Sequence, residues 1–98
     1  MARKMVFTPL AGHCRAGFVN SWHIAALKVL AEVDKRIHDH PEAGTETSKK
    51  GRFVQRLTVA VFPKTFLCEV VYSFTSRSIR WESFAWKVIP AAAPSSKP

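Results

Sequence analysis

The strongest hydrophobic pattern in the chain lies between residues 22 and 37. Apolar residues recur there at the three- and four-residue spacing that lines one face of a helix: Trp22, Ala26, Val29, Leu30, Val33 and Ile37. Ile24 and Leu27 widen this face, which indicates a helix lying across a sheet. Asn20 and Ser21 are good N-cap residues, and Pro41 disfavours helical geometry in the residue before it. The pattern therefore predicts an amphipathic helix that begins after these caps and ends before the proline.

Three runs with a period of two follow, over residues 53–62, 66–74 and 79–89. The second run alternates most regularly, with one face made of Phe66, Cys68, Val70, Tyr72 and Phe74. Pro63 with Lys64, and the segment 75–78, have the composition of turns. Because strands joined by short turns normally pair with each other, the runs predict a three-stranded antiparallel meander covered by the helix.

The third run predicts two faces of different chemistry. Phe84, Trp86 and Val88 share one face, which we expect to lie under the helix. The period of two places Trp81 on the opposite, exposed face. The other residues predicted on that face are Arg56, Thr58, Glu69, Ser73 and Lys87.

The remaining segments complete the predicted architecture. Residues 4–8 predict a short strand, whereas segment 10–19 contains Gly12 and Gly17 among polar residues and is interpreted as a loop. Residues 41–51 lack periodicity and predict a mobile loop, and the Pro/Ala/Ser-rich segment 90–98 predicts a disordered tail. We therefore expect a single small α+β domain over residues 1–89. It has one amphipathic helix packed on a three-stranded antiparallel meander, with a short N-terminal strand as an optional addition (β-α-β-β-β).

Charge changes this picture more than any other bulk property. The chain of 98 residues has 15 Lys and Arg against 7 Asp and Glu, which gives a formal charge of +8. Such a charge favours anionic partners, so we expect nucleic acid (DNA or RNA) or an acidic protein surface. A chain this short has a thin stability margin, which makes a second copy of itself a further candidate partner. The plainer alternative is a basic surface that only keeps the protein in solution.

Cysteine content and hydropathy bear on the cellular compartment. Cys14 and Cys68 are too few for a disulfide framework, and Cys68 has the spacing of a core residue. No stretch is long and apolar enough to span a membrane. We expect reduced thiols and a cytoplasmic location. A mitochondrial location is the alternative, because Arg3 and Arg15 lie in a segment with no acidic residue before Glu32.

A basic cluster at the start of the first run is the first candidate binding site. Lys49 and Lys50 lie on the predicted loop, and Arg52 and Arg56 follow them at the start of a strand. Such side chains can neutralise phosphates without a fixed geometry. The competing interpretation is a solvated loop whose charges protect a strand end.

The predicted exposed sheet face is the second candidate. Trp81 among basic and hydroxyl residues, Lys87 among them, can stack on a base. Arg77 and Arg80, at or beside the turn before the third run, can extend the positive patch. The same face suits a protein partner, because Trp and Arg are favoured at binding hot spots. The structural alternative is that Trp81 lies at a sheet edge or under the N-terminal segment.

Metal binding and catalysis find no support in the spacing of reactive residues. The four histidines form no zinc pattern, since the chain has no Cys-x-x-Cys and no two His at i and i+4: His13, His23, His38 and His40. No two acidic residues are placed as an evident acid–base pair. We therefore predict a non-enzymatic binding protein with no metal and no cofactor.

Two functions fit these observations. The order helix–strand–strand–strand resembles the first part of a double-stranded-RNA-binding domain. In that family a second helix, which begins with a lysine-rich motif, follows the sheet, whereas this chain has the Pro/Ala/Ser-rich segment 90–98 at that place. No residue is therefore carried over from that family. The first hypothesis is a module that contacts nucleic-acid phosphates. The alternative is a protein-binding inhibitor or adaptor of phage or mobile-element type, such as an anti-CRISPR-like protein, acting through the sheet face or an edge strand.

Overall fold

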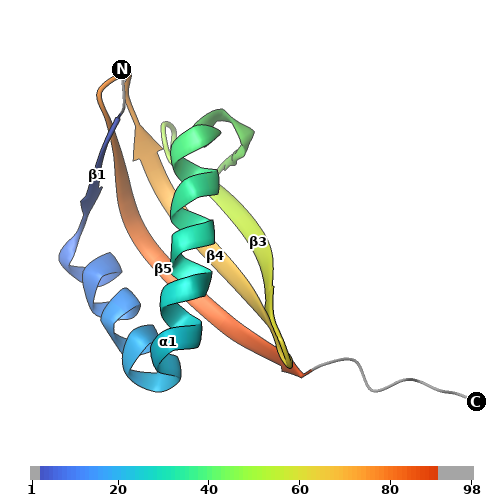
Figure 1. The fold of residues 1–98 in the computed structure, drawn as a ribbon. Coiled ribbons are helices and arrows are strands. Elements are labelled where there is room, and N and C mark those ends of the chain that lie inside the picture. The colour runs from blue at the N-terminus through green and yellow to red at the C-terminus, as the bar shows by residue number, and fades with distance from the viewer. Residues whose placement is uncertain (1–2, 91–98) are drawn as a thin grey trace, which may run out of the picture.

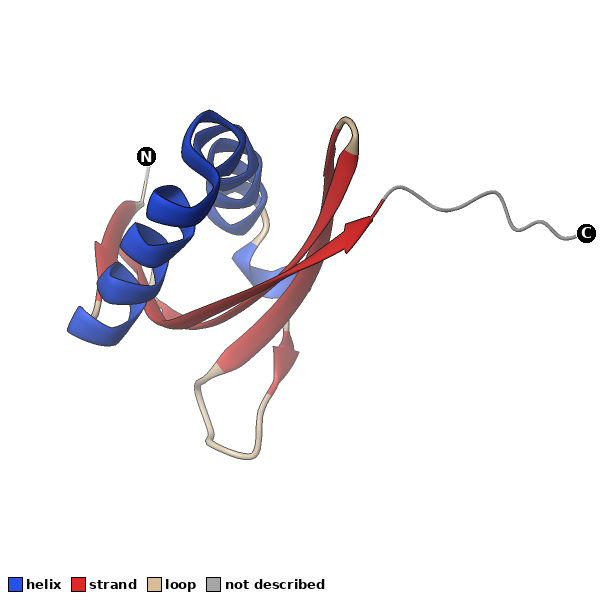
Figure 2. Ribbon diagram, turned by 90° about the horizontal axis from the view of Figure 1, so that it is seen from below, coloured by secondary structure: helices blue, strands red, loops and turns tan. Residues whose placement is uncertain are grey.

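A helical layer covers one face of a twisted five-stranded sheet (Figures 1 and 2). The computed structural model describes residues 3–90. Its elements are β1 (Lys4–Phe7), α1 (Pro9–Asp39), the 3-10 helix η1 (Pro41–Ala43), β2 (Thr45–Glu46), β3 (Phe53–Val61), β4 (Lys64–Phe74) and β5 (Ser78–Pro90). The strand order is β1-β5-β4-β3-β2, with β1 parallel to β5 and every other pair antiparallel. The predicted α+β class, the meander and the short N-terminal strand are confirmed, and β2 is an additional strand.

Helix α1 begins at Pro9, so the prediction of a loop over residues 10–19 is wrong. The Thr8 hydroxyl caps the helix by accepting a hydrogen bond from the amide of Ala11 (3.1 Å), and Pro9 stands at the first helical position, where its missing N–H costs nothing. Gly12 and Gly17 lie where an added Cβ would meet no atom within 4 Å. Each glycine weakens the helix by about 1 kcal/mol relative to alanine without breaking it.

The helix is divided at His23, where the backbone leaves helical geometry with φ 53° and ψ −122°. These angles resemble the first central position of a type II′ turn, which glycine normally occupies. The two helical segments run in opposite directions along the same face of the sheet (Figure 1). Most of the predicted helix corresponds to the second segment, which ends at Asp39, before Pro41 as expected. Its predicted start is wrong, because Asn20, Ser21 and Trp22 lie in the first segment.

Aromatic and branched side chains fill the space between the helical segments and the sheet. Phe18 of the first segment lies 5.6 Å from Phe66, 5.6 Å from Phe84 and 5.0 Å from Trp86, measured between ring centroids. Cys68 is fully buried in this core, and burial raises the pKa of its thiol to about 11. Both cysteines are free thiols. Among residues 3–90, no helix has the length and apolar character needed to cross a membrane.

The segment predicted as a mobile loop, 41–51, contains both η1 and β2. Tyr72 anchors it, because its buried hydroxyl donates to the carbonyl of Pro41 and accepts from Gln55 Nε2 (3.0 Å). Gly44 follows η1 at a point where an added Cβ would collide with the same Tyr72 hydroxyl. The predicted disordered tail lies outside the described residues, apart from Pro90, which ends β5.

Candidate nucleic-acid interface

The sheet face turned away from α1, here called the outer face, has no helix across it in residues 3–90 (Figure 2). Buried positions such as Leu57 and Cys68 point toward the helices. Their neighbours Arg56 and Glu69 therefore point outward, as strand alternation requires. This arrangement leaves the predicted polar face of β3 and β4 open to a partner.

Trp81 does not belong to the outer face, so its predicted role in base stacking is wrong. It is fully buried, with its ring 5.4 Å from that of Phe7. The cause is a bulge: Val71 pairs with Ser83, but the next residue, Tyr72, pairs with Trp81. The strand thus contains one extra residue, Glu82, which reverses the alternation. Trp81 and Phe84 consequently both face the helices.

Glu82, the extra residue of the bulge, lies between two arginines at the end of the outer face nearest the β4–β5 turn. This end is at the top of Figure 1 and is called the upper end. Its carboxylate lies 3.8 Å from Arg52 Nη2 and 3.5 Å from Arg80 Nε. Ser73, which pairs with Arg80 across the strands, donates to the same carboxylate at 3.4 Å. The Glu82 side chain is 15% exposed, whereas those of Arg52 and Arg80 are 41% and 59% exposed. Two guanidinium groups thus share one carboxylate and keep a net positive charge accessible to solvent.

The loop between β2 and β3 brings Lys49 and Lys50 next to Arg52. The Glu46 carboxylate accepts from the Gly51 amide (2.7 Å), and Gly51 takes φ 84°, which glycine adopts without strain. Both lysines are exposed and have no carboxylate within 4.0 Å in the described part of the chain. Figure 2 shows the loop projecting from the sheet on the side away from the helices.

Arg56 and Lys87 lie further along the outer face and form a second, weaker positive region. Arg56 Nε bonds Glu69 Oε2 at 2.8 Å, across the β3–β4 pairing. A shallow pocket of about 200 Å³ lies between these residues, lined also by Leu67, Ala85 and Trp86. An exposed pair of this kind contributes less than about 1 kcal/mol, so Arg56 can exchange its partner.

Three further cations join the upper end of the sheet through β1. The amide of Lys4 donates to the Arg77 carbonyl (2.9 Å), and Arg3 Nε donates to the Thr75 carbonyl (2.8 Å). Arg77 lies in the turn between β4 and β5. The parallel pairing of Lys4 with Ser78 causes this approach. Arg3 and Lys4 were not predicted as part of the site, because no local pattern in the sequence specifies a strand pairing over more than seventy positions.

Two of the four histidines, His38 and His40, lie beside neighbouring carboxylates. His38 Nδ1 lies 3.1 Å from Asp39 Oδ1, and His40 Nδ1 lies 3.6 Å from Glu42 Oε2. Within residues 3–90, no group of three His, Cys, Asp or Glu side chains is arranged to hold a metal ion.

Comparison of the chain with protein families, with curated proteins and with solved structures found no match.

Proposed function

We propose that the protein binds the phosphates of nucleic acid at the upper end of the sheet. The supporting observation is a cluster of cations from the β2–β3 loop, the β4–β5 turn and strands β1 and β5, called here the basic end: Lys4, Lys49, Lys50, Arg52, Arg77 and Arg80. These elements span the five strands of the sheet, or about 19 Å at about 4.8 Å per strand. That width accommodates several consecutive phosphates of a nucleic-acid backbone.

The bound nucleic acid is recognised by its backbone in this proposal. With Trp81 in the core, the outward positions of β3, β4 and β5 carry no aromatic residue in the described chain. The proposal therefore does not depend on base stacking, which favours single strands. Phosphate contacts alone position a protein without reading sequence. We expect weak dependence on base sequence and strong dependence on salt.

A binding titration at two salt concentrations tests the proposal. Labelled duplex and single-stranded DNA and RNA are titrated with the full chain, followed by fluorescence anisotropy. If about four phosphates are neutralised, the affinity for duplex DNA should fall about a hundredfold between about 50 and 200 mM salt. No saturable binding at the lower salt concentration would disprove the proposal.

Two matched double variants separate a local site from overall charge. Replacing Lys49 and Lys50 with alanine should weaken binding about tenfold and reduce the salt slope by nearly two. Replacing Lys28 and Lys35 of α1 removes the same charge from the helical side of the molecule. That control should have a much smaller effect. Equal losses in the two variants would show that net charge, and not the basic end, determines binding.

A further inference from the structure

The free edge of β3 is an unoccupied site for another strand. β3 pairs with β4 along its full length, from Phe53 to Val61. On its other side β2 pairs only with Phe53 and Val54, so segment 55–61 has no strand beside it in the described chain. Because backbone groups alternate in direction in an antiparallel sheet, about three residues of this segment direct both N–H and C=O groups outward. Edges of this kind pair with other strands unless they are blocked.

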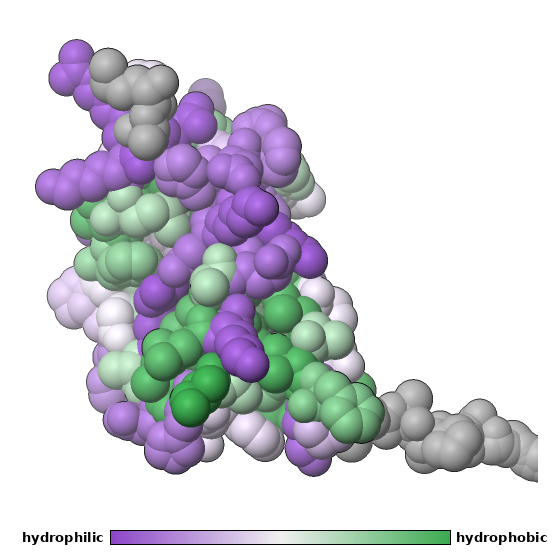
Figure 3. All heavy atoms as spheres, viewed as in Figure 1, coloured by the Kyte–Doolittle hydropathy of each residue, from purple (hydrophilic) through white to green (hydrophobic). Residues whose placement is uncertain are grey.

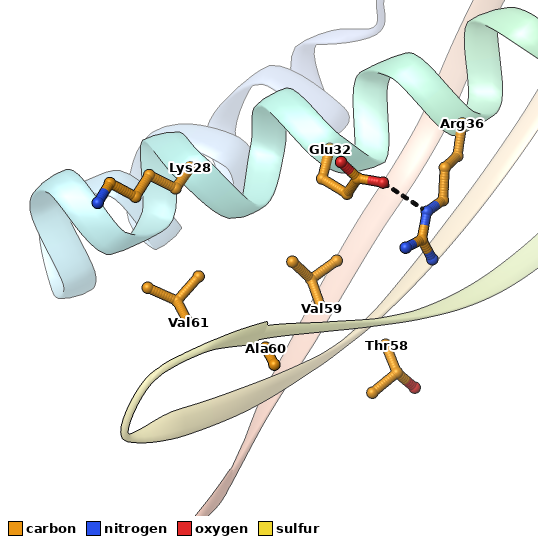
Figure 4. A pocket seen from close by; sticks show the side chains of 7 residues that line it. All are labelled: Lys28, Glu32, Arg36, Thr58, Val59, Ala60 and Val61. Atoms are coloured by element: carbon orange, nitrogen blue, oxygen red, sulfur yellow. Dashed lines mark hydrogen bonds and ion pairs between the residues drawn. The ribbon is translucent and has the colours of Figure 1, made fainter.

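A groove runs along this edge, between β3 and the second segment of α1 (Figure 4). Its volume is about 580 Å³, and β3 contributes the stretch from Thr58 to Val61. Lys28, Glu32 and Arg36, spaced one helical turn apart, line the opposite wall. The groove thus has the two parts of a peptide site formed by strand addition: an open edge for the backbone and a row of side chains for specificity.

The charges along the helical wall favour an acidic occupant. Arg36 Nε bonds Glu32 Oε2 at 2.8 Å, so these two side chains neutralise each other. Lys28 has no carboxylate within 4.0 Å among residues 3–90. The wall therefore carries one net positive charge, on a chain whose formal charge is +8. An added strand with a carboxylate opposite Lys28 would give this lysine the ion-pair partner that it lacks among residues 3–90.

Apolar surface lies beyond the lower end of the groove, near the turn between β3 and β4. Figure 3 shows hydrophobic surface gathered at this end of the molecule, away from the hydrophilic upper end. Leu27 and Ile24 of α1 are 55% and 70% exposed, and Phe62 in the turn after β3 is 93% exposed. An apolar residue at one end of the added strand would cover part of this surface.

A second copy of the chain fits the groove poorly. Pairing two β3 edges about a twofold axis through the middle of the groove would bring the two helical walls together in opposite directions. The order of charges in each wall is positive, negative, positive, so Lys28 would face Arg36 of the copy and Glu32 would face its own equivalent. Like charges would then meet at every position, which disfavours this pairing.

We propose that this groove binds an extended acidic segment of a partner protein, which adds to β3 as a sixth strand. A carboxylate of the segment faces Lys28, and an apolar residue lies near Phe62. The site is on the helical side of the sheet and is separate from the basic end.

A synthetic peptide tests strand addition directly. The probe is a fluorescein-labelled, end-capped peptide of about nine residues in which Val and Glu alternate. A control peptide has the same sequence with alternate amides N-methylated, so that its charge is kept but the donors along the edge that would face β3 are removed. The first peptide should bind saturably, and the control should bind at least about tenfold more weakly, since about three hydrogen bonds are lost. Equal binding of the two peptides would overturn the proposal.

Two charge-reversal variants locate the bound peptide. Lys28→Glu should weaken binding about fivefold or more, because an attractive pair becomes repulsive. Lys35→Glu makes the same change in net charge at an exposed position of α1 outside the groove, so its effect should be below about twofold. Equal losses in both variants would reduce the effect to general attraction between a basic protein and an acidic peptide.

Hydrogen exchange gives the final readout. Peptide binding should slow exchange of the outward-directed amides in segment 55–61 of β3. The stretch of β5 from Ser83 to Pro90 lies beyond its pairing with β1 and is a second uncovered edge. Protection confined to β5, or to the basic end, would place the peptide elsewhere and contradict the proposal.

Discussion

Arg15 is the residue whose removal should most disturb the packing of the two helical segments. Its guanidinium makes two bonds with the Asp34 carboxylate, at 2.7 Å and 3.1 Å, and so ties the first segment of α1 to the second. The same group lies 4.4 Å from the ring centre of Phe7 and 4.7 Å from that of Trp81. One side chain thus connects both helical segments, β1 and β5. We expect Arg15→Ala to destabilise the fold strongly.

The expected loss follows from these contacts. Hydrogen bonds to charged groups contribute about 1.5–3 kcal/mol, and a cation over an aromatic ring contributes about 0.5–1 kcal/mol. The side chains of Arg15 and Asp34 are 20% and 35% exposed, so solvent reduces the ionic part. We therefore expect Arg15→Ala to lower the free energy of unfolding by about 2 kcal/mol. For a chain of this size it corresponds to a decrease in Tm of about 8–16 °C.

Chemical denaturation of the variants in a double-mutant cycle measures the total loss of stability and the share that comes from the Arg15–Asp34 pair. Arg15→Ala, Asp34→Ala and the double variant are unfolded in urea, and the coupling free energy between the two positions is expected to be about 1 kcal/mol. Arg15→Lys keeps the charge but loses the planar fork, and should recover less than half of the loss. A loss below about 0.5 kcal/mol in Arg15→Ala, or zero coupling with Asp34, would refute this account of the contact.

Substitutions at three further positions test local features of the fold. Gly44→Ala should cost about 1–3 kcal/mol in urea unfolding, because its Cβ would collide with the hydroxyl of Tyr72; a neutral result would mean that the anchoring of segment 41–51 is looser than described. His23→Gly should raise stability by about 1 kcal/mol by relieving a positive φ, whereas His23→Ala, which keeps a Cβ, should not; equal effects would contradict the strain argument. Burial raises the pKa of the Cys68 thiol from 9.0 to about 11, so stability should fall as the pH rises from about 9 to 11, where the unfolded thiol ionises and the folded one does not. In Cys68→Ala this part of the alkaline decrease should disappear, and an unchanged pH profile would exclude the thiol as its source.

Periodicity was sufficient to predict the elements that are regular over their whole length. The stripe from Ala26 to Ile37 and the alternation from Phe66 to Phe74 correspond to the second segment of α1 and to β4. In both cases one face is buried along the entire element, so the hydrophobic pattern is uninterrupted. The end of the helix was also predictable, because Pro41 acts locally.

The first helical segment was missed because its signal is short and interrupted. Ala11 and Phe18 are fully buried at a spacing of seven residues, which is two helical turns. Gly12 and Gly17 lie between and beside them and favour a loop interpretation. The side chain that most firmly ties this segment to the rest of the protein, Arg15, is charged, and hydrophobic periodicity cannot detect it.

The bulge at Glu82 carries the largest functional consequence of the differences between prediction and structure. A single extra residue in β5 moves Trp81 from the outer face into the core, and it places a carboxylate between Arg52 and Arg80. The first change removes the only aromatic side chain predicted on that face. The second holds two guanidinium groups in place while leaving them partly exposed. Both changes shift the interpretation of the outer face from base stacking to phosphate contact, and they do so through backbone register, which no pattern of residue types specified.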